Sequence, residues 1–97
     1  MDTTFSFQGI AFVWDTAKAR LNLSKHRIPF EQAVEAFFDP FLKVVDAARQ
    51  GETREAVIGF DTRGRLLFVV HLEWTEHAIR LISARPATRQ ERQYYET

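Results

Sequence analysis

The chain has 97 residues, no cysteine and a formal net charge of zero at neutral pH. Its length and its 45% of hydrophobic residues suit one domain with an adequate core, and the lack of cysteine excludes disulfides, thiol nucleophiles and cysteine-based zinc sites. The neutral net charge argues against a strongly basic nucleic-acid binder. The sequence shows no signal peptide and no apolar run near the roughly 20 residues that a membrane span needs. We therefore expect a cytoplasmic protein with no membrane partner.

The first half of the chain predicts one strand and two helices. Residues 1–9 are polar and contain Gly9, so we expect a flexible arm before a single domain at residues 10–97. Residues 10–14 read as a strand, and Asp15 can cap a helix that runs to about His26. Its buried stripe is expected to follow Ala17 and Leu21, with Asn22 pointing away. After Pro29, apolar residues at helical spacing predict a second helix over residues 30–38.

The second half predicts four strands and a short helix. Strands are expected at residues 41–45, 55–60, 65–74 and 78–85, with a hairpin turn at residues 61–64. The third of these is apolar on both faces, so we place it centrally. Pro86 ends the last strand, and Thr88 and Glu91 have the spacing of a helix capping box. The predicted order β-α-α-β-β-β-β-α is an α+β fold with a mostly antiparallel sheet.

Basic residues are concentrated at the C-terminal end. Residues 78–97 hold four arginines and two glutamates, whereas residues 1–77 hold nine basic and eleven acidic residues. A guanidinium held in place binds phosphate or carboxylate through two parallel hydrogen bonds, so the cluster suits an anionic ligand. A solvated helix face would explain the same charges.

The pairing of the last two strands decides which arginines act together. A three-residue loop would oppose Leu67 and Arg85 and put Arg65, Ser83 and Arg85 on one face. A two- or four-residue loop shifts the register by one residue and brings Arg80 to that face instead of Arg85. The sequence leaves both registers open.

Metal and cofactor chemistry are not expected. The three histidines, at positions 26, 71 and 77, have no metal-ligand spacing, and no phosphate-binding glycine loop or paired-carboxylate motif is present. His71 lies within an apolar strand and is most simply a core histidine. We therefore predict no metal ion and no cofactor.

Several segments resemble one family. Residues 80–96, RLISARPATRQERQYYE, are similar to the C-terminal signature of the BrnT family, toxins of bacterial type II toxin–antitoxin pairs. Three further parts of the chain resemble other segments of the family: Phe12 to Asp15 with Lys25-His26, Phe30 to Pro40, and Gly64 to His71. The resemblance covers nearly all of the chain after Ile10. One departure is Arg27, where the family usually has glycine.

The resemblance implies a RelE-like fold and a metal-free endoribonuclease that cleaves RNA by 2′-OH attack. A BrnA-type antitoxin would neutralise the toxin, and the toxin would contact operator DNA only through the toxin–antitoxin complex. That complex is expected to allow a heterotetramer that contains a toxin homodimer. The candidate catalytic residues are Arg65, Arg80, Arg85, Tyr95 and His26. The candidate RNA-binding residues are Lys25, which is also a proton-transfer candidate, Arg89, Arg92 and Tyr94.

The alternative is a non-catalytic binding module. In that case the arginine-rich C-terminal helix would dock an acidic protein partner, most simply the antitoxin.

Overall fold

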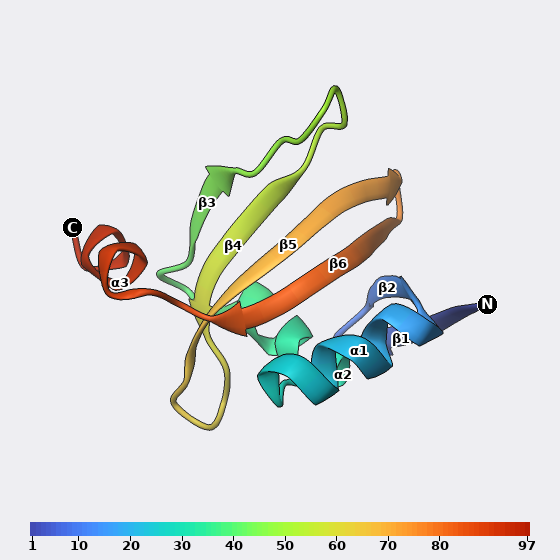
Figure 1. Cartoon of the computed structure of the whole chain (residues 1–97), viewed down its shortest axis with the longest axis horizontal. Helices are drawn as coiled ribbons and strands as arrows, with labels where there is room; N and C mark the ends of the chain where they lie inside the picture. Colours follow the sequence, from blue (N-terminus) through green and yellow to red (C-terminus); the bar gives the residue numbers. More distant parts are fainter.

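One six-stranded sheet organises the molecule. In the computed structural model, which describes residues 1–97, the strands lie in the order β1-β2-β6-β5-β4-β3 (Figure 1). All neighbours are antiparallel except β2 and β6, which are parallel. The α+β class and the mostly antiparallel sheet are therefore confirmed. The strands are β1 (Asp2–Phe7), β2 (Ile10–Asp15), β3 (Lys43–Asp46), β4 (Glu55–Phe60), β5 (Leu66–Thr75) and β6 (Ala78–Pro86).

The predicted flexible arm at residues 1–9 is wrong, because β1 pairs along its whole length with β2. Every second side chain of β1 is partly buried, and Phe5 and Phe7 pack against the hydrophobic core. Gln8 and Gly9, both with positive φ (50° and 82°), form the tight turn into β2. The element order therefore begins with two strands, one more than predicted.

Helix α1 (Thr16–His26) begins as predicted, with the Asp15 side chain accepting a hydrogen bond from the Lys18 amide at 3.0 Å. Its predicted buried stripe is wrong. Leu21 is 70% exposed, whereas Asn22 is buried. The side chain of Asn22 pairs with the backbone of Ala84 in both directions: Nδ2 donates to the Ala84 carbonyl at 2.9 Å, and Oδ1 accepts from the Ala84 amide at 3.0 Å. Nδ2 also donates to the Ile28 carbonyl.

Helix α1 ends at Arg27, whose backbone is left-handed with φ 62° and ψ 27°. This conformation costs an L-residue roughly 1–2 kcal/mol, but it is open to glycine. We expect Arg27→Gly to raise the free energy of unfolding by about 0.5–1 kcal/mol in urea titrations. The matched control is Arg20→Gly on an exposed helical position, which should lower it by about 1 kcal/mol. A lower free energy of unfolding for Arg27→Gly would show that the Arg27 side chain stabilises the fold by more than its left-handed backbone destabilises it.

The second predicted helix is present in two parts, α2 (Phe30–Ala33) and a 3-10 turn η1 (Val34–Phe38). The buried side chains of Phe30, Ala33 and Val34 join those of β2, β5 and β6 in one core. Segment η1 lies so close to β4 that a Cβ on Gly59 would come within 2.5 Å of the Ala36 carbonyl oxygen. Helix α3 (Arg89–Tyr95) lies beside the β3 edge of the sheet (Figure 1), where Tyr95 and Arg92 contact Phe60 at the end of β4. No helix is long and apolar enough to cross a membrane.

Candidate active site

A bulge in β6 puts Arg80 and Arg85 on the same face of the sheet. Arg85 lies opposite Phe68, Ser83 opposite Val70, and Arg80 opposite Leu72, while the register shifts at Ile82 between them. The two-residue loop that the sequence left open is present, with Thr75 opposite Ala78, but the shift at Ile82 means that neither predicted arrangement, Arg85 beside Arg65 or Arg80 in place of Arg85, is found. The extra residue restores the alternation, so both guanidiniums point away from the helical core layer.

Arg85 is held in a fixed orientation. Its two terminal nitrogens donate to the two carboxylate oxygens of Glu91, each at 2.8 Å, and its guanidinium lies over the Phe68 ring at 4.2 Å. Hydrogen bonding to Glu91 raises the pKa of Arg85, and that of Glu91 is lowered by the same contact. Glu91 also completes the predicted capping box, accepting from the Thr88 amide. One carboxylate thus starts α3 and fixes the arginine.

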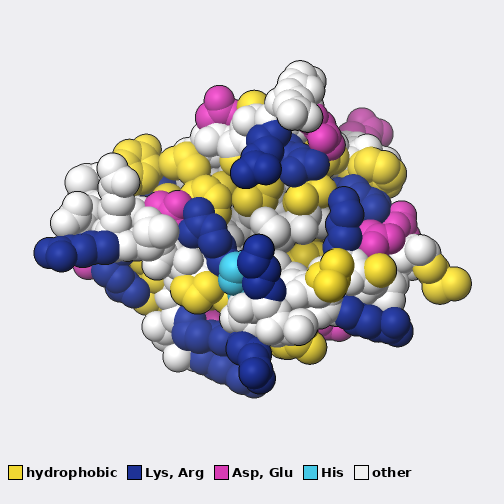
Figure 2. Space-filling model, viewed as in Figure 1, with side chains coloured by type: hydrophobic (Ala, Val, Ile, Leu, Met, Phe, Trp, Pro, Cys, Tyr) yellow, Lys and Arg dark blue, Asp and Glu magenta, His cyan; other side chains and the backbone are white.

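Arg85 lines a hollow of about 520 Å³ on this open face of the sheet. Two further arginines, Arg49 and Arg54, reach it from the loop between β3 and β4, and Ser83 adds a hydroxyl. Figure 2 shows Lys and Arg side chains spread over this face around a band of hydrophobic ones. The remaining lining residues are Asp46, Ala47, Ala48, Phe68, Val70 and Ile82. Neither loop arginine was singled out from the sequence, since they lie in a polar loop with no motif.

The other two candidate arginines are not part of this hollow. Arg80 is paired through both terminal nitrogens with Asp2 of β1, at 3.0 and 3.1 Å, and lies over the Trp74 ring at 4.5 Å. Arg65 donates through Nε to the buried carboxylate of Asp61 at 2.8 Å, at the turn between β4 and β5. The structure therefore separates the three candidate catalytic arginines, and only Arg85 joins other guanidiniums.

Tyr95 is a link between α3 and the body of the domain. Its hydroxyl donates to Asp39 Oδ2 at 2.6 Å, and its ring packs edge-on against Phe60. Burial and the neighbouring carboxylate raise the pKa of Tyr95 to about 12. Burial alone would raise the pKa of Asp39, but hydrogen bonds from Tyr95 and the Phe60 and Phe41 amides hold it below its usual value. The phenol is therefore protonated at neutral pH and is poorly suited to act as a base.

The remaining candidates do not line the hollow. Lys25 and His26 form the last turn of α1, which ends near the C-terminal end of β6 (Figure 1). Arg89, Arg92 and Tyr94 are exposed on α3, where Tyr94 lies beneath the Lys43 ammonium at 5.1 Å. His71, by contrast, is buried against Phe37, and burial lowers its pKa.

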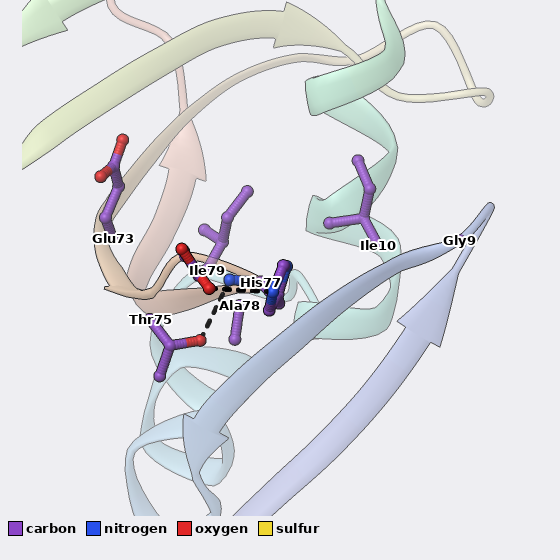
Figure 3. Close-up of a pocket in the computed structure, with 8 residues that line it drawn as sticks. Gly9, Ile10, Glu73, Thr75, His77, Ala78 and Ile79 are labelled. Atoms are coloured by element: carbon purple, nitrogen blue, oxygen red, sulfur yellow. Dashed lines mark hydrogen bonds and ion pairs between the residues drawn. The ribbon is translucent and has the colours of Figure 1, made fainter.

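A second hollow, of about 580 Å³, lies between the β1–β2 turn and the β5–β6 turn (Figure 3). Its lining includes Glu73, Glu76 and His77 and no arginine, so it would repel a phosphate. Nowhere in the chain do three His, Cys, Asp or Glu side chains come together in an arrangement that could hold a metal ion.

Comparison with known proteins gives one family. A family model described as "Ribonuclease toxin, BrnT, of type II toxin-antitoxin system" matches residues 14–91. Among solved structures, the chain is similar to the crystal structure of the Brucella abortus ribonuclease toxin BrnT at 1.1 Å resolution, with a TM-score of 0.63 and 26% sequence identity. The alignment covers 78% of this chain and 94% of that one. No curated protein matches the chain.

Proposed function

This chain belongs to the BrnT family of ribonuclease toxins of type II toxin–antitoxin systems, and from that membership we propose that it cleaves RNA at the hollow lined by Arg49, Arg54 and Arg85. The proposed reaction needs no metal ion. A ribose 2′-oxygen attacks the adjacent phosphorus, the bond from phosphorus to the 5′-oxygen breaks, and the products carry a 2′,3′-cyclic phosphate and a 5′-hydroxyl.

The observation that carries this proposal is the fixed guanidinium of Arg85 at the wall of a hollow that two other arginines share. Negative charge builds up on the phosphate oxygens as the 2′-oxygen attacks. Cationic donors that are already oriented stabilise this charge without reorganising during the reaction. The three arginines of the hollow favour a mechanism in which guanidiniums supply the positive charge that a metal ion supplies in other ribonucleases.

Two protons must move in this reaction, one from the 2′-hydroxyl and one to the leaving 5′-oxygen. Tyr95 fits the first step poorly, because its pKa of about 12 keeps it protonated and its proton is engaged by Asp39. We keep His26 and Lys25, at the end of α1, as the proton-transfer candidates. Arg65 and Arg80 are assigned to structural ion pairs with Asp61 and Asp2 in this scheme.

Substrate binding is assigned to exposed cations outside the hollow. Arg89 and Arg92 on α3, together with Lys25, would contact phosphates that flank the cleaved bond, and Tyr94 would stack on a base. Affinity for RNA should then fall steeply with salt concentration, since each phosphate contact releases counterions.

As a toxin of a type II pair, the protein has RNA as its substrate and a cognate antitoxin as its partner. We propose that the antitoxin is of the BrnA type and that contact with operator DNA occurs only in the toxin–antitoxin complex. A heterotetramer containing two toxin chains is part of the same proposal.

Cleavage by the purified protein is expected to continue in excess EDTA, with cyclic phosphate and 5′-hydroxyl ends on the products. A 2′-O-methyl group at the cleaved position should protect the RNA, because it removes the nucleophile. The products are read by gel electrophoresis and mass spectrometry. A mock purification from cells that do not express the protein controls for contaminating ribonucleases. Loss of cleavage in EDTA with recovery on adding Mg²⁺ would overturn the metal-free mechanism.

A further inference from the structure

Arg54 carries a buried hydrogen-bond donor that has no partner. Its Nη2 donates to Glu52 Oε2 at 3.0 Å, but its Nε is buried and makes no hydrogen bond. The side chain is only 21% exposed. A buried charged group with an unsatisfied donor is unfavourable, and folded proteins keep few of them. Arg65 Nη2 is the other buried side-chain donor without a partner, but Arg65 lies at the β4–β5 turn, whereas Arg54 lines the hollow and is therefore the one placed to meet a ligand.

The ion pair with Glu52 does not account for the position of the Arg54 side chain. Glu52 is 53% exposed and lies two residues before Arg54 in the same loop. Exposed ion pairs of this kind add little to the stability of the fold. The pair could also form with the Arg54 guanidinium fully in solvent, so it does not explain why the side chain is partly buried. Arg85 differs, because both of its terminal nitrogens are matched by carboxylate oxygens.

The loop holds Arg49 and Arg54 on a folded scaffold. Arg49 and Glu52 exchange backbone hydrogen bonds at 3.2 and 2.8 Å, which closes a tight turn at Gln50 and Gly51. Both turn residues have positive φ, 46° and 80°, as a two-residue hairpin connection requires. The loop is thus a short hairpin extension of β3 and β4, with Arg49 before its tip and Arg54 at its base. Both arginines reach the hollow that Arg85 lines.

We infer that Arg54, assisted by Arg49, binds the RNA backbone phosphate next to the one that is cleaved. Arg85 has a fixed position from Glu91 and Phe68, so it suits the phosphate at which charge develops. Arg54 lines the same hollow, its one ion-pair partner Glu52 is exposed, and guanidiniums bind phosphate oxygens through paired hydrogen bonds. This inference rests on the proposed function. It adds a second phosphate subsite, formed by the β3–β4 loop.

The test compares Arg54→Ala and Arg54→Lys with a matched control, Arg63→Ala, which removes an exposed arginine at the β4–β5 turn. Affinity is measured with a non-cleavable 2′-O-methyl hexaribonucleotide over a range of salt concentrations. Arg54→Ala should weaken binding by about tenfold to hundredfold and reduce the slope of log affinity against log salt by about 0.7, the share of one single-strand phosphate contact. Arg54→Lys should keep the slope and recover part of the affinity. Arg63→Ala should bind as the parent chain does.

Cleavage separates this subsite from the catalytic one. A dinucleoside monophosphate contains only the cleaved phosphate, so the loss caused by Arg54→Ala should be at least tenfold smaller on it than on a hexaribonucleotide. Equal losses on both substrates, or unchanged affinity and slope at a normal melting temperature, would overturn the inference. A variant that melts early yet binds normally once folded would assign Arg54 to structure alone. If instead Arg85→Ala cleaves normally, the proposed function fails, while the binding experiment with the non-cleavable RNA still decides the role of Arg54.

Discussion

Arg85→Ala is expected to slow RNA cleavage by about 10²–10³-fold at saturating substrate. Arg85 is the one candidate catalytic arginine in the hollow, and removing a preorganised charge contact to a transition state typically has this effect. Initial rates on a labelled oligoribonucleotide measure it, and thermal melts show whether the fold is retained. Full activity at a normal melting temperature would clear Arg85 of a catalytic role. The end of α1, with Lys25 and His26, would then be the next place to search.

Two further variants separate charge from orientation at this arginine. Arg85→Lys keeps the positive charge but loses the paired hydrogen bonds to Glu91, so its rate should lie between those of the parent and the alanine variant. Glu91→Gln keeps a capping side chain for Thr88 but no longer binds Arg85 as an ion pair. It should lower the maximal rate more than the substrate affinity, because a less fixed Arg85 still attracts RNA.

Asn22→Ala is expected to lower the free energy of unfolding by about 3–5 kcal/mol. Its side chain satisfies the amide and carbonyl of Ala84 and the carbonyl of Ile28, all at buried positions. Each group left without a partner costs roughly 1–3 kcal/mol, and domains of this size have only about 5–15 kcal/mol in total. Urea unfolding followed by circular dichroism measures the change.

Leu21→Ala is the matched control for Asn22. It removes a larger hydrophobic side chain from the neighbouring position of α1, but that side chain is 70% exposed. We expect a change within about 0.5 kcal/mol. Should Leu21→Ala prove the more damaging of the two, the orientation of α1 on the sheet would have to be rotated. Because Ala84 directly precedes Arg85, Asn22 also holds the backbone next to the candidate catalytic arginine.

Local signals predicted the local structure well. The cap at Asp15 and the capping box of Thr88 and Glu91 depend on residues three apart, and both are present. Hydrophobic periodicity gave the wrong buried face for α1, because it favours burial of Leu21 over Asn22. It takes no account of the three hydrogen bonds that the Asn22 side chain makes to backbone groups elsewhere in the chain. It also missed β1, whose two partly buried phenylalanines, Phe5 and Phe7, lie in a short polar segment.

The candidate site was less accessible to sequence reasoning, because it depends on pairing across the sheet. If side chains alternate strictly along β6, only one of Arg80 and Arg85 can lie on the face of the sheet that carries the hollow. The bulge at Ile82 places both on that face. Their ion-pair partners lie at quite different separations, six residues away for Arg85 and 78 for Arg80. Arg49 and Arg54 reach the hollow through a loop whose course no spacing rule predicts.

The strand β1 lies outside the region matched by the family model, yet it closes one side of the sheet. Without it, β2 would present an open row of backbone donors and acceptors, which is the usual template for association between copies of a protein. β1 takes over this edge position, and its exposed side chains, Asp2, Thr4 and Ser6, are all polar. Because charged and polar side chains make an edge strand a poorer template for pairing than hydrophobic ones, copies of the chain are less prone to join through this edge.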